Sequence, residues 1–223
     1  SNTYLVGTGR ERLLIDTGEG KPAWIASLKD VLQEEDATIS QTLITHWHHD
    51  HQGGINHLLE LSPMINIYKH EPGEVLEEED AMFTGDNVLG HGTAVFEDLP
   101  VYLHSLEKMR TKFRGRAYPG HGTIIEDGPS KILEYIQHRQ LRENQVMQVL
   151  KSCKSSRGVD VASEPDKWTS MDIVKVIYKD VPESLHLPAN GGVIQILRKL
   201  EAEEKVVEDS KSERWSLKKR AAL

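Results

Sequence analysis

Four of the chain's eleven histidines and one aspartate fall within ten residues, in the stretch THWHHDHQGG at 45–54. In an extended segment, residues two apart face the same side, so His46 and His48 can converge on one ion. Asp50 and His51 follow in what we expect to be a loop, where they can face a neighbouring ion. Imidazole and carboxylate ligands suit zinc, and also iron or manganese. The stretch therefore predicts a metal site rather than a polar loop held by hydrogen bonds.

Two later segments each end in a further potential ligand. DAMFTGD at 80–86 and GRAYPGH at 115–121 both have the composition of short strands. The first ends at Asp86 and the second at His121. Ligands at strand ends can reach a common site when the strands lie in one layered core.

The remaining pattern alternates strands with helices. We expect further strands at 2–7, 12–18, 40–45 and 64–70, and helices at 22–35, 55–62, 98–113 and 128–153. Such alternation is typical of an α/β fold.

The composition changes at 154–166, a polar stretch with serine, glycine and proline that we interpret as part of a linker. Helices are expected at 169–180 and 191–207, followed by a hairpin at 205–219. Two helices and a hairpin resemble a winged-helix module, which could serve as a lid docked on the main domain or as a DNA-binding element. We therefore expect a main domain with the metal site at 1–151, a linker at 152–166 and a winged-helix-like domain at 167–223.

Composition excludes some classes of protein. The chain contains no apolar run long enough for a membrane span. The start lacks signal-peptide features, and the single Cys153 cannot form an internal disulfide, so the expected location is cytoplasmic. The net charge is −8, and residues 1–151 carry 14 Lys and Arg against 23 Asp and Glu. This balance does not favour nucleic-acid binding.

THWHHDHQGG resembles the T-H-x-H-x-D-H-x-x-G signature of the metallo-β-lactamase superfamily. The resemblance implies an αββα sandwich with a one- or two-metal hydrolytic site between its sheets. LLIDTG matches a family strand whose aspartate, here Asp16, braces the metal loop. FTGD and YPGHG match the strands that supply a bridging carboxylate, here Asp86, and a ligand of the second metal, here His121. The implied cofactor is a pair of zinc ions, with manganese or iron as alternatives.

Within this superfamily the chain is similar to the β-lactamase-like-2 branch, and most of all to fungal thioesterases that release polyketide acids such as atrochrysone carboxylic acid. The stretches at 2–22, 37–54 and 132–143 carry this likeness. It implies an acyl-carrier-protein domain of a polyketide synthase as partner. A second branch activity, cleavage of single-stranded RNA, is the alternative, and a non-catalytic binding module is a third possibility.

Asp50 is the expected catalytic residue, in addition to being a ligand. Metal ions bring the pKa of a bound water near 7, and Asp50 would position this water and shuttle its proton. A thiolate leaving group needs little acid assistance because the pKa of a thiol is about 8.5.

One family feature is absent from the sequence. Members carry a third histidine on the first metal in a PGHTxDH-like turn, but this chain passes from IYKHEP directly to GEVLEEEDAMFTGD. We therefore expect an incomplete sandwich. Three explanations are open: residues of the natural protein are omitted, truncation or splicing removed the turn, or His70 replaces the ligand. His91 could line the substrate entrance or be an ordinary loop histidine.

Overall fold

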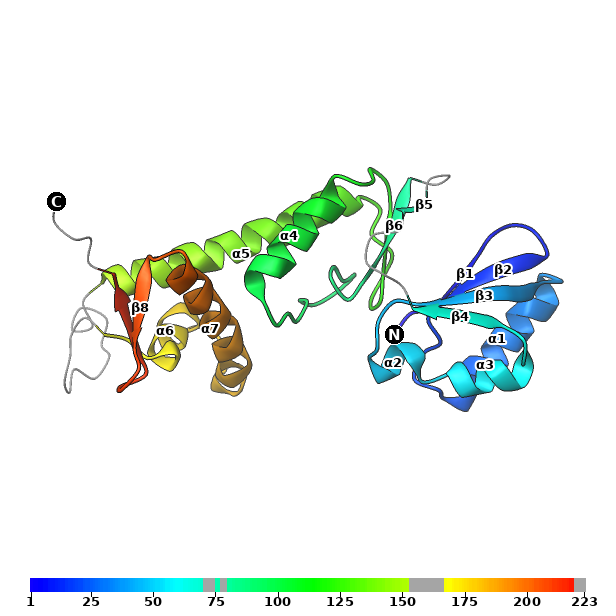
Figure 1. The fold of residues 1–223 in the computed structure, drawn as a ribbon, viewed down its shortest axis with the longest axis horizontal. Coiled ribbons are helices and arrows are strands. Elements are labelled where there is room, and N and C mark those ends of the chain that lie inside the picture. Colours follow the sequence, from blue (N-terminus) through cyan, green and yellow to red (C-terminus); the bar gives the residue numbers. More distant parts are fainter. Residues whose placement is uncertain (70–74, 77–79, 153–166, 219–223) are drawn as a thin grey trace. The chain divides into compact units, whose positions relative to one another are not determined.

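The computed structural model describes residues 1–69, 75–76, 80–152 and 167–218 (Figure 1). They belong to two compact units. The first unit comprises Ser1–Val95 and Leu106–Leu133, and the second comprises Phe96–Ser105 and Glu134–Leu223. In chain order the elements are β1 (Tyr4–Val6), β2 (Glu11–Ile15), α1 (Pro22–Glu34), β3 (Thr38–Ile44), α2 (His49–Gln52), α3 (Ile55–Leu61), β4 (Asn66–Lys69), β5 (Val75–Leu76), β6 (Ala81–Gly85), α4 (Leu99–Arg110), β7 (Ala117–Pro119), α5 (Gly128–Lys151), α6 (Ser170–Ile177), η2 (Glu183–Leu185), α7 (His186–Ala202), β8 (Val206–Asp209) and β9 (Arg214–Leu217).

The larger sheet of the first unit has the order β1-β2-β3-β4. β1 and β2 are antiparallel, whereas β2, β3 and β4 run parallel and are joined by helical crossovers. α1 and α3 lie against one face of this sheet (Figure 1). Leu28 of α1, Leu58 of α3 and Leu14 of β2 form the buried cluster between them. Burying each such leucine stabilises the fold by about 1.5–3 kcal/mol, so this layer holds the strands that lead to the histidine stretch.

A smaller sheet has the order β5-β6-β7, with β6 and β7 parallel. Ala81 and Met82 of β6 and Ala117 of β7 are buried. Phe113 is also buried, and it packs so closely over Gly128 that a side chain there would overlap its ring. The segment that follows α4 and the start of α5 therefore close over this sheet.

Backbone hydrogen bonds fix the segments that follow the strands of both sheets. The amide of Gly120, just after β7, donates to the carbonyl of Gly85 at the end of β6 (2.8 Å). The amide of Asn2 donates to the carbonyl of Gly120 (2.7 Å), which ties the start of the chain to the smaller sheet. In the larger sheet, the amide of Thr17 donates to the carbonyl of His51 (2.7 Å). The segments that carry the candidate ligands are thus fixed by main-chain bonds.

The second unit contains α6, α7 and the antiparallel hairpin β8-β9. Thr169 begins α6 with a reciprocal capping box, because its side chain accepts from the amide of Asp172 while the Asp172 carboxylate accepts from the amide of Thr169. Trp168 is completely buried and pairs through its backbone with Trp215 of β9. These contacts produce the two helices and hairpin that the sequence predicts.

Two expectations about local structure were wrong. Asp50 and His51 do not lie in a loop, because His49–Gln52 form the short helix α2. The second helix of the C-terminal module begins at His186 rather than at 191 and ends at Ala202, so the residues expected to finish it form β8 instead. Within the expected linker 152–166, only Ser152 lies among the described residues. No helix of the described residues is long and apolar enough to cross a membrane.

Candidate metal centre

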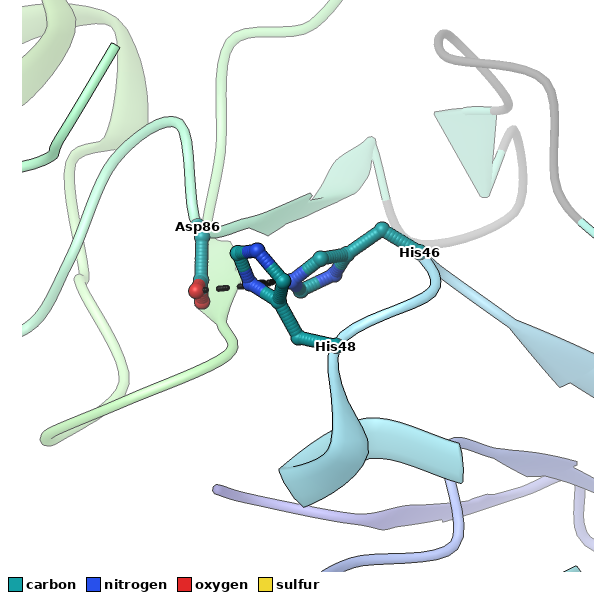
Figure 2. Close-up of side chains that lie close together, drawn as sticks. All are labelled: His46, His48 and Asp86. Atoms are coloured by element: carbon teal, nitrogen blue, oxygen red, sulfur yellow. Dashed lines mark hydrogen bonds and ion pairs between the residues drawn. The ribbon is translucent and has the colours of Figure 1, made fainter. Parts of the chain in front are cut away.

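His46, His48 and Asp86 form the first cluster (Figure 2). The two histidines follow β3 and the aspartate follows β6, and the imidazole rings lie beside the carboxylate (Figure 2). His46 Nε2 lies 2.9 Å from His48 Nδ1 and 3.5 Å from Asp86 Oδ2. Three ligand-type groups from two sheets thus meet at one point.

Asp50, His51 and His121 form the second cluster. Asp50 and His51 belong to α2, and His121 follows β7. Asp50 Oδ2 lies 3.3 Å from His51 Nε2 and 3.1 Å from His121 Nε2. The two imidazole nitrogens are themselves 3.4 Å apart. His51 is fully buried, whereas the other two side chains are about one-third exposed.

Asp86 presents one oxygen to each cluster. Its Oδ2 faces His46, and its Oδ1 lies 3.5 Å from the Nε2 atoms of both His51 and His121. Oδ1 is buried and receives no hydrogen bond from the described residues. A buried carboxylate oxygen without a donor carries a desolvation cost that a cation would remove. Asp86 therefore lies where a bridging carboxylate is required, and bridging itself stays a prediction.

Asp16 connects the end of β2 with the histidine stretch. Its Oδ1 accepts from the amide of Thr45 (2.7 Å), and its Oδ2 accepts from the Thr45 hydroxyl (2.8 Å). The same Oδ2 lies 2.7 Å from His51 Nδ1, which must then be the protonated nitrogen because a carboxylate only accepts. This contact leaves the Nε2 lone pair of a neutral His51 directed into the second cluster.

Charge in the clusters shifts two pKa values. Burial lowers the pKa of His51, but the hydrogen bond that it donates to Asp16 and the charges of Asp16, Asp86 and Asp50 outweigh this effect, so the pKa is raised. Burial raises the pKa of Asp86, but the hydrogen bond from His46 and the neighbouring histidines outweigh it, so the pKa is lowered. The raised pKa of His51 thus reflects the carboxylates around it, and the lowered pKa of Asp86 reflects the histidines around it.

The donor set of the second cluster fits a zinc ion. Four ligand atoms ordered as a tetrahedron at about 2.0 Å from zinc have edges of about 3.3 Å. The five distances among Asp50 Oδ2, His51 Nε2, His121 Nε2 and Asp86 Oδ1 given above range from 3.1 to 3.5 Å. Nitrogen and oxygen acceptors at this spacing repel one another unless a proton or cation lies among them. The residues are therefore compatible in type and spacing with a divalent cation.

Sequence reasoning missed two residues that shape the centre. Thr45 holds Asp16 through both its amide and its hydroxyl. Gly120 lies so close to the clusters that a Cβ atom would be 2.4 Å from Asp86 Oδ1 and 2.8 Å from His51 Cε1. Thr45 begins the histidine stretch, and Gly120 lies in YPGHG. Each residue therefore belongs to a recognised motif, but the sequence alone did not indicate its role.

Among the residues that the structure describes, the other histidines join neither cluster. His49 is exposed in α2, and His91 is exposed on a loop where the neighbouring Gly90 donates to the carbonyl of His121 (2.9 Å). No structural observation assigns His91 to a substrate entrance. His70 and Cys153 lie outside the described residues.

A cavity of about 250 Å³ opens beside the first cluster. His46, His48 and Asp86 form part of its wall. Apolar side chains form another part: Met82, Phe83, Val95 and Met109. The cavity therefore places an apolar surface next to candidate metal ligands.

Comparison with known proteins defines the class. Residues 1–102 match the metallo-β-lactamase superfamily, and residues 169–215 match a β-lactamase-associated winged helix domain. A metallo-β-lactamase family protein from Thermus thermophilus has a similar structure, with a TM-score of 0.65, 18% identity, and coverage of 97% of this chain and 93% of the other. The fold is thus that of a metallo-β-lactamase with a C-terminal winged helix domain, as the sequence predicted.

Relatives of known sequence place the chain within this class. Lactamase-like protein aptB from Emericella nidulans is 37% identical over 241 residues, covering 92% of this chain and 77% of the relative. Atrochrysone carboxyl ACP thioesterase from Aspergillus chevalieri is 38% identical over 242 residues, with coverages of 92% and 77%. Thioesterase pkgB from Emericella nidulans is 42% identical over 200 residues, with coverages of 73% and 59%. The chain belongs to the metallo-β-lactamase superfamily and is a hydrolase of this class.

The first two alignments are longer than the 223-residue chain itself. They therefore contain positions at which the relatives have residues and this chain has none. Membership of the superfamily implies binding of a divalent metal, and the two clusters are the candidate ligands for it.

Proposed function

We propose that this protein hydrolyses the thioester between a polyketide acyl chain and an acyl-carrier-protein domain of a polyketide synthase, and so releases the carboxylic acid. The observation that carries the proposal is the pair of clusters joined by Asp86, with an apolar cavity against one of them. The names of two relatives, an atrochrysone carboxyl ACP thioesterase and a thioesterase, support the reaction class. The proposed cofactor is zinc, with manganese or iron as alternatives.

The proposed ligands are those that the sequence indicated. His46, His48 and Asp86 would hold one cation, and Asp50, His51 and His121 the other, with Asp86 also facing the second. Bound divalent cations polarise a carbonyl oxygen and lower the pKa of water to near 7.

The protein's own side chains would orient the reaction. Asp50 is one-third exposed, so its carboxylate can contact a water that enters from solvent, position it and accept its proton. Asp16 would keep the His51 ring in one orientation and one tautomer through the 2.7 Å contact. The thiolate that leaves needs no dedicated acid, since the pKa of a thiol is about 8.5.

The cavity would receive the acyl group. Met82 and Met109 are almost fully buried, so they form a fixed apolar wall, whereas Val95 is almost fully exposed at the rim. An apolar acyl chain gains free energy by leaving water for such a surface. A polyanionic RNA strand gains nothing from these side chains, and the acidic balance of residues 1–151 also disfavours it.

The domain organisation is part of the proposal. Residues 1–151 would form the hydrolase domain and residues 167–223 the winged-helix domain, with 152–166 as linker. All residues of the two clusters lie within the first of these ranges.

The test is hydrolysis of an acyl carrier protein charged with an aromatic acyl thioester. We expect turnover that is lost on chelation and restored by zinc or manganese. Asp50→Ala should lower kcat by about 100-fold or more, because proton transfer by a positioned side chain contributes 10²–10⁴-fold. Exposed His49, which belongs to neither cluster, provides the control, and His49→Ala should retain activity.

A parallel assay uses a single-stranded RNA oligonucleotide. Metal-dependent cleavage of the RNA without hydrolysis of the thioester would replace the proposed function by the nuclease alternative. Wild-type rates of thioester hydrolysis in Asp50→Ala would remove that residue from the mechanism.

A further inference from the structure

We propose that a basic segment, residues 108–116, docks an acidic surface of the acyl-carrier-protein domain and so holds the acyl thioester at the mouth of the cavity. The inference rests on the proposed function, because it takes a carrier protein as the partner. It goes beyond that function because it assigns recognition of the protein part of the substrate to particular residues of this chain.

The segment is basic within an acidic part of the chain. Its sequence, KMRTKFRGR, holds five of the 14 Lys and Arg residues in 1–151 and no Asp or Glu, although that range contains 23 acidic residues. It comprises the end of α4 and the turn before β7, and it belongs to the first unit. An acidic surface repels an anionic partner, whereas a local cluster of cations attracts it. The segment therefore favours one orientation of such a partner.

Three of the five cations are available to a partner. Arg110 pairs with Glu107 at 3.1 Å, and Arg116 pairs with Glu126 at 2.8 Å. The other three are exposed and form no ion pair with any residue that the structure describes: Lys108, Lys112 and Arg114. We call these three residues the docking cations.

The backbone that carries the docking cations is fixed. The amide of Arg114 donates to Asp80 Oδ1 (3.0 Å), and the amide of Gly115 donates to the carbonyl of Asp80 (2.9 Å). Phe113 is buried against Gly128, as described above. A surface that is ordered before binding loses less conformational entropy when a partner docks.

The segment adjoins the cavity beside the first cluster. Met109, which lies within the segment, forms part of the cavity wall. Met82, another residue of this wall, donates its amide to the carbonyl of Arg116 (3.0 Å). An acyl group that enters the cavity stays tethered to its carrier until the thioester is cleaved. The carrier must therefore lie against the residues around the cavity, and the basic segment is among them.

The chemistry of the segment favours a protein partner over RNA. Proteins that bind single-stranded RNA combine cations with aromatic side chains on which bases stack. The one aromatic residue of the segment is Phe113, which is 3% exposed and offers no ring to a base. The carboxylates of a carrier protein need only the cations. Charge complementarity therefore points to an acidic protein surface.

The test reverses the three docking charges together, because a single exposed ion pair contributes little. In the full chain carrying Lys108→Glu, Lys112→Glu and Arg114→Glu, the Kd for the unacylated carrier domain should rise by about tenfold, as measured by calorimetry. The KM for the acylated carrier should rise in parallel. Hydrolysis of the same acyl group on N-acetylcysteamine should keep its wild-type rate, which also shows that the variant is folded.

Salt provides a second measurement on the same proteins. Exposed charges are screened as the Debye length falls from about 10 Å at 0.1 M salt to about 3 Å at 1 M. Wild-type affinity for the carrier should therefore fall over this range, whereas the affinity of the triple variant should change less.

Lys112→Glu and Lys29→Glu form a matched pair, since each replaces an exposed lysine of the first unit by glutamate. Lys29 of α1 lies near Thr38 at the amino end of β3, whereas His46 and His48 follow its carboxyl end, about 20 Å away. Lys112→Glu should weaken carrier binding by about threefold, and Lys29→Glu should leave it unchanged. Lys112→Arg should bind as the wild type does.

Each contrary outcome has a distinct meaning. Unchanged affinity in the triple variant, equal effects of Lys112→Glu and Lys29→Glu, or no binding of the carrier by the wild type would overturn the docking surface while leaving thioester hydrolysis intact. Binding of a single-stranded RNA oligonucleotide that requires the docking cations, without binding of the carrier, would replace the carrier by RNA. Carrier binding that the triple variant loses, with no hydrolysis of either thioester by the wild type, would overturn only the proposed function.

Discussion

Asp16 shows how much of the centre depends on one carboxylate. Its backbone lies in the left-handed region at φ 59°, a conformation that costs an aspartate about 1 kcal/mol. Hydrogen bonds offset this cost, because both carboxylate oxygens of Asp16 accept them. The donors are the amide and the hydroxyl of Thr45 and the ring of His51. The strained backbone of Asp16 therefore directs its carboxylate toward both Thr45 and His51.

Gly120 offers a residue-level prediction. In Gly120→Ala the added methyl carbon would lie 2.4 Å from Asp86 Oδ1, well inside van der Waals contact. The carboxylate must move, and both clusters lose the oxygen that it supplies. We expect zinc affinity to fall by about tenfold or more, with thioester hydrolysis falling in parallel. Zinc titration of the purified variant measures the first effect.

The matched control is Gly9→Ala, since a Cβ atom at Gly9 meets nothing within 4 Å. This variant should bind zinc as the wild type does. Unchanged affinity in Gly120→Ala would show that Asp86 does not need its present position to hold the metal.

The sequence was sufficient to predict which residues are candidate ligands, but not which residues pack around them. The histidine stretch, Asp86 and His121 could be predicted as ligands because their motifs are specific and occur in the expected order. The role of Gly120 could not, because it depends on which loop the folded chain places over Asp86. A glycine that is required because a side chain would not fit cannot be recognised from motif spacing or from charge.

At the scale of the elements, short and irregular segments escaped prediction. The strands and helices with clear apolar periodicity were predicted with ends within a few residues of those observed. α2 has only four residues, too few for helical periodicity to emerge, and it was expected to be a loop. The start of α7 was placed five residues late because Gly191 and Gly192 have poor helix propensity and were taken as the beginning. Packing of Val193, Ile196 and Leu197 in the core outweighs this local preference.

These two glycines give a prediction about α7. A Cβ atom at either position meets nothing within 4 Å, and neither glycine has a positive φ. Gly191→Ala and Gly192→Ala should each stabilise the second unit by about 0.5–1 kcal/mol, because alanine loses less backbone entropy on entering a helix. Thermal or urea unfolding followed by tryptophan fluorescence measures this change, since Trp168 and Trp215 are buried in the unit.

A glycine-to-alanine substitution at Gly54, in the first unit, should have the opposite effect on stability. At Gly54 a Cβ atom would lie 2.1 Å from the carbonyl oxygen of Thr17 and 2.6 Å from the ring of Trp24. Gly54→Ala should therefore destabilise the protein. If the α7 variants were also destabilising, the helix would not begin at His186 as described.

At the scale of the whole molecule, the candidate ligands all belong to the first unit. A ligand that binds only the folded state stabilises it by about 2.7 kcal/mol at a free concentration 100 times its Kd. Zinc should therefore slow amide exchange in the first unit, most strongly at 45–54 and 118–122. Hydrogen exchange with and without zinc measures this difference.

The second unit provides the internal reference for that experiment. Its helices α6 and α7 contain no residue of either cluster, so their exchange should change less than that of the first unit. Equal protection in α7 would mean that the ion is held elsewhere or that the two units unfold as one.

If both clusters hold cations, the carboxylate of Asp86, which faces each of them, would make the two sites thermodynamic partners. A cation that draws electron density from Oδ1 leaves Oδ2 a poorer ligand, and two neighbouring divalent charges repel each other. Each occupant therefore weakens the hold on its neighbour, and linkage requires the penalty to be reciprocal.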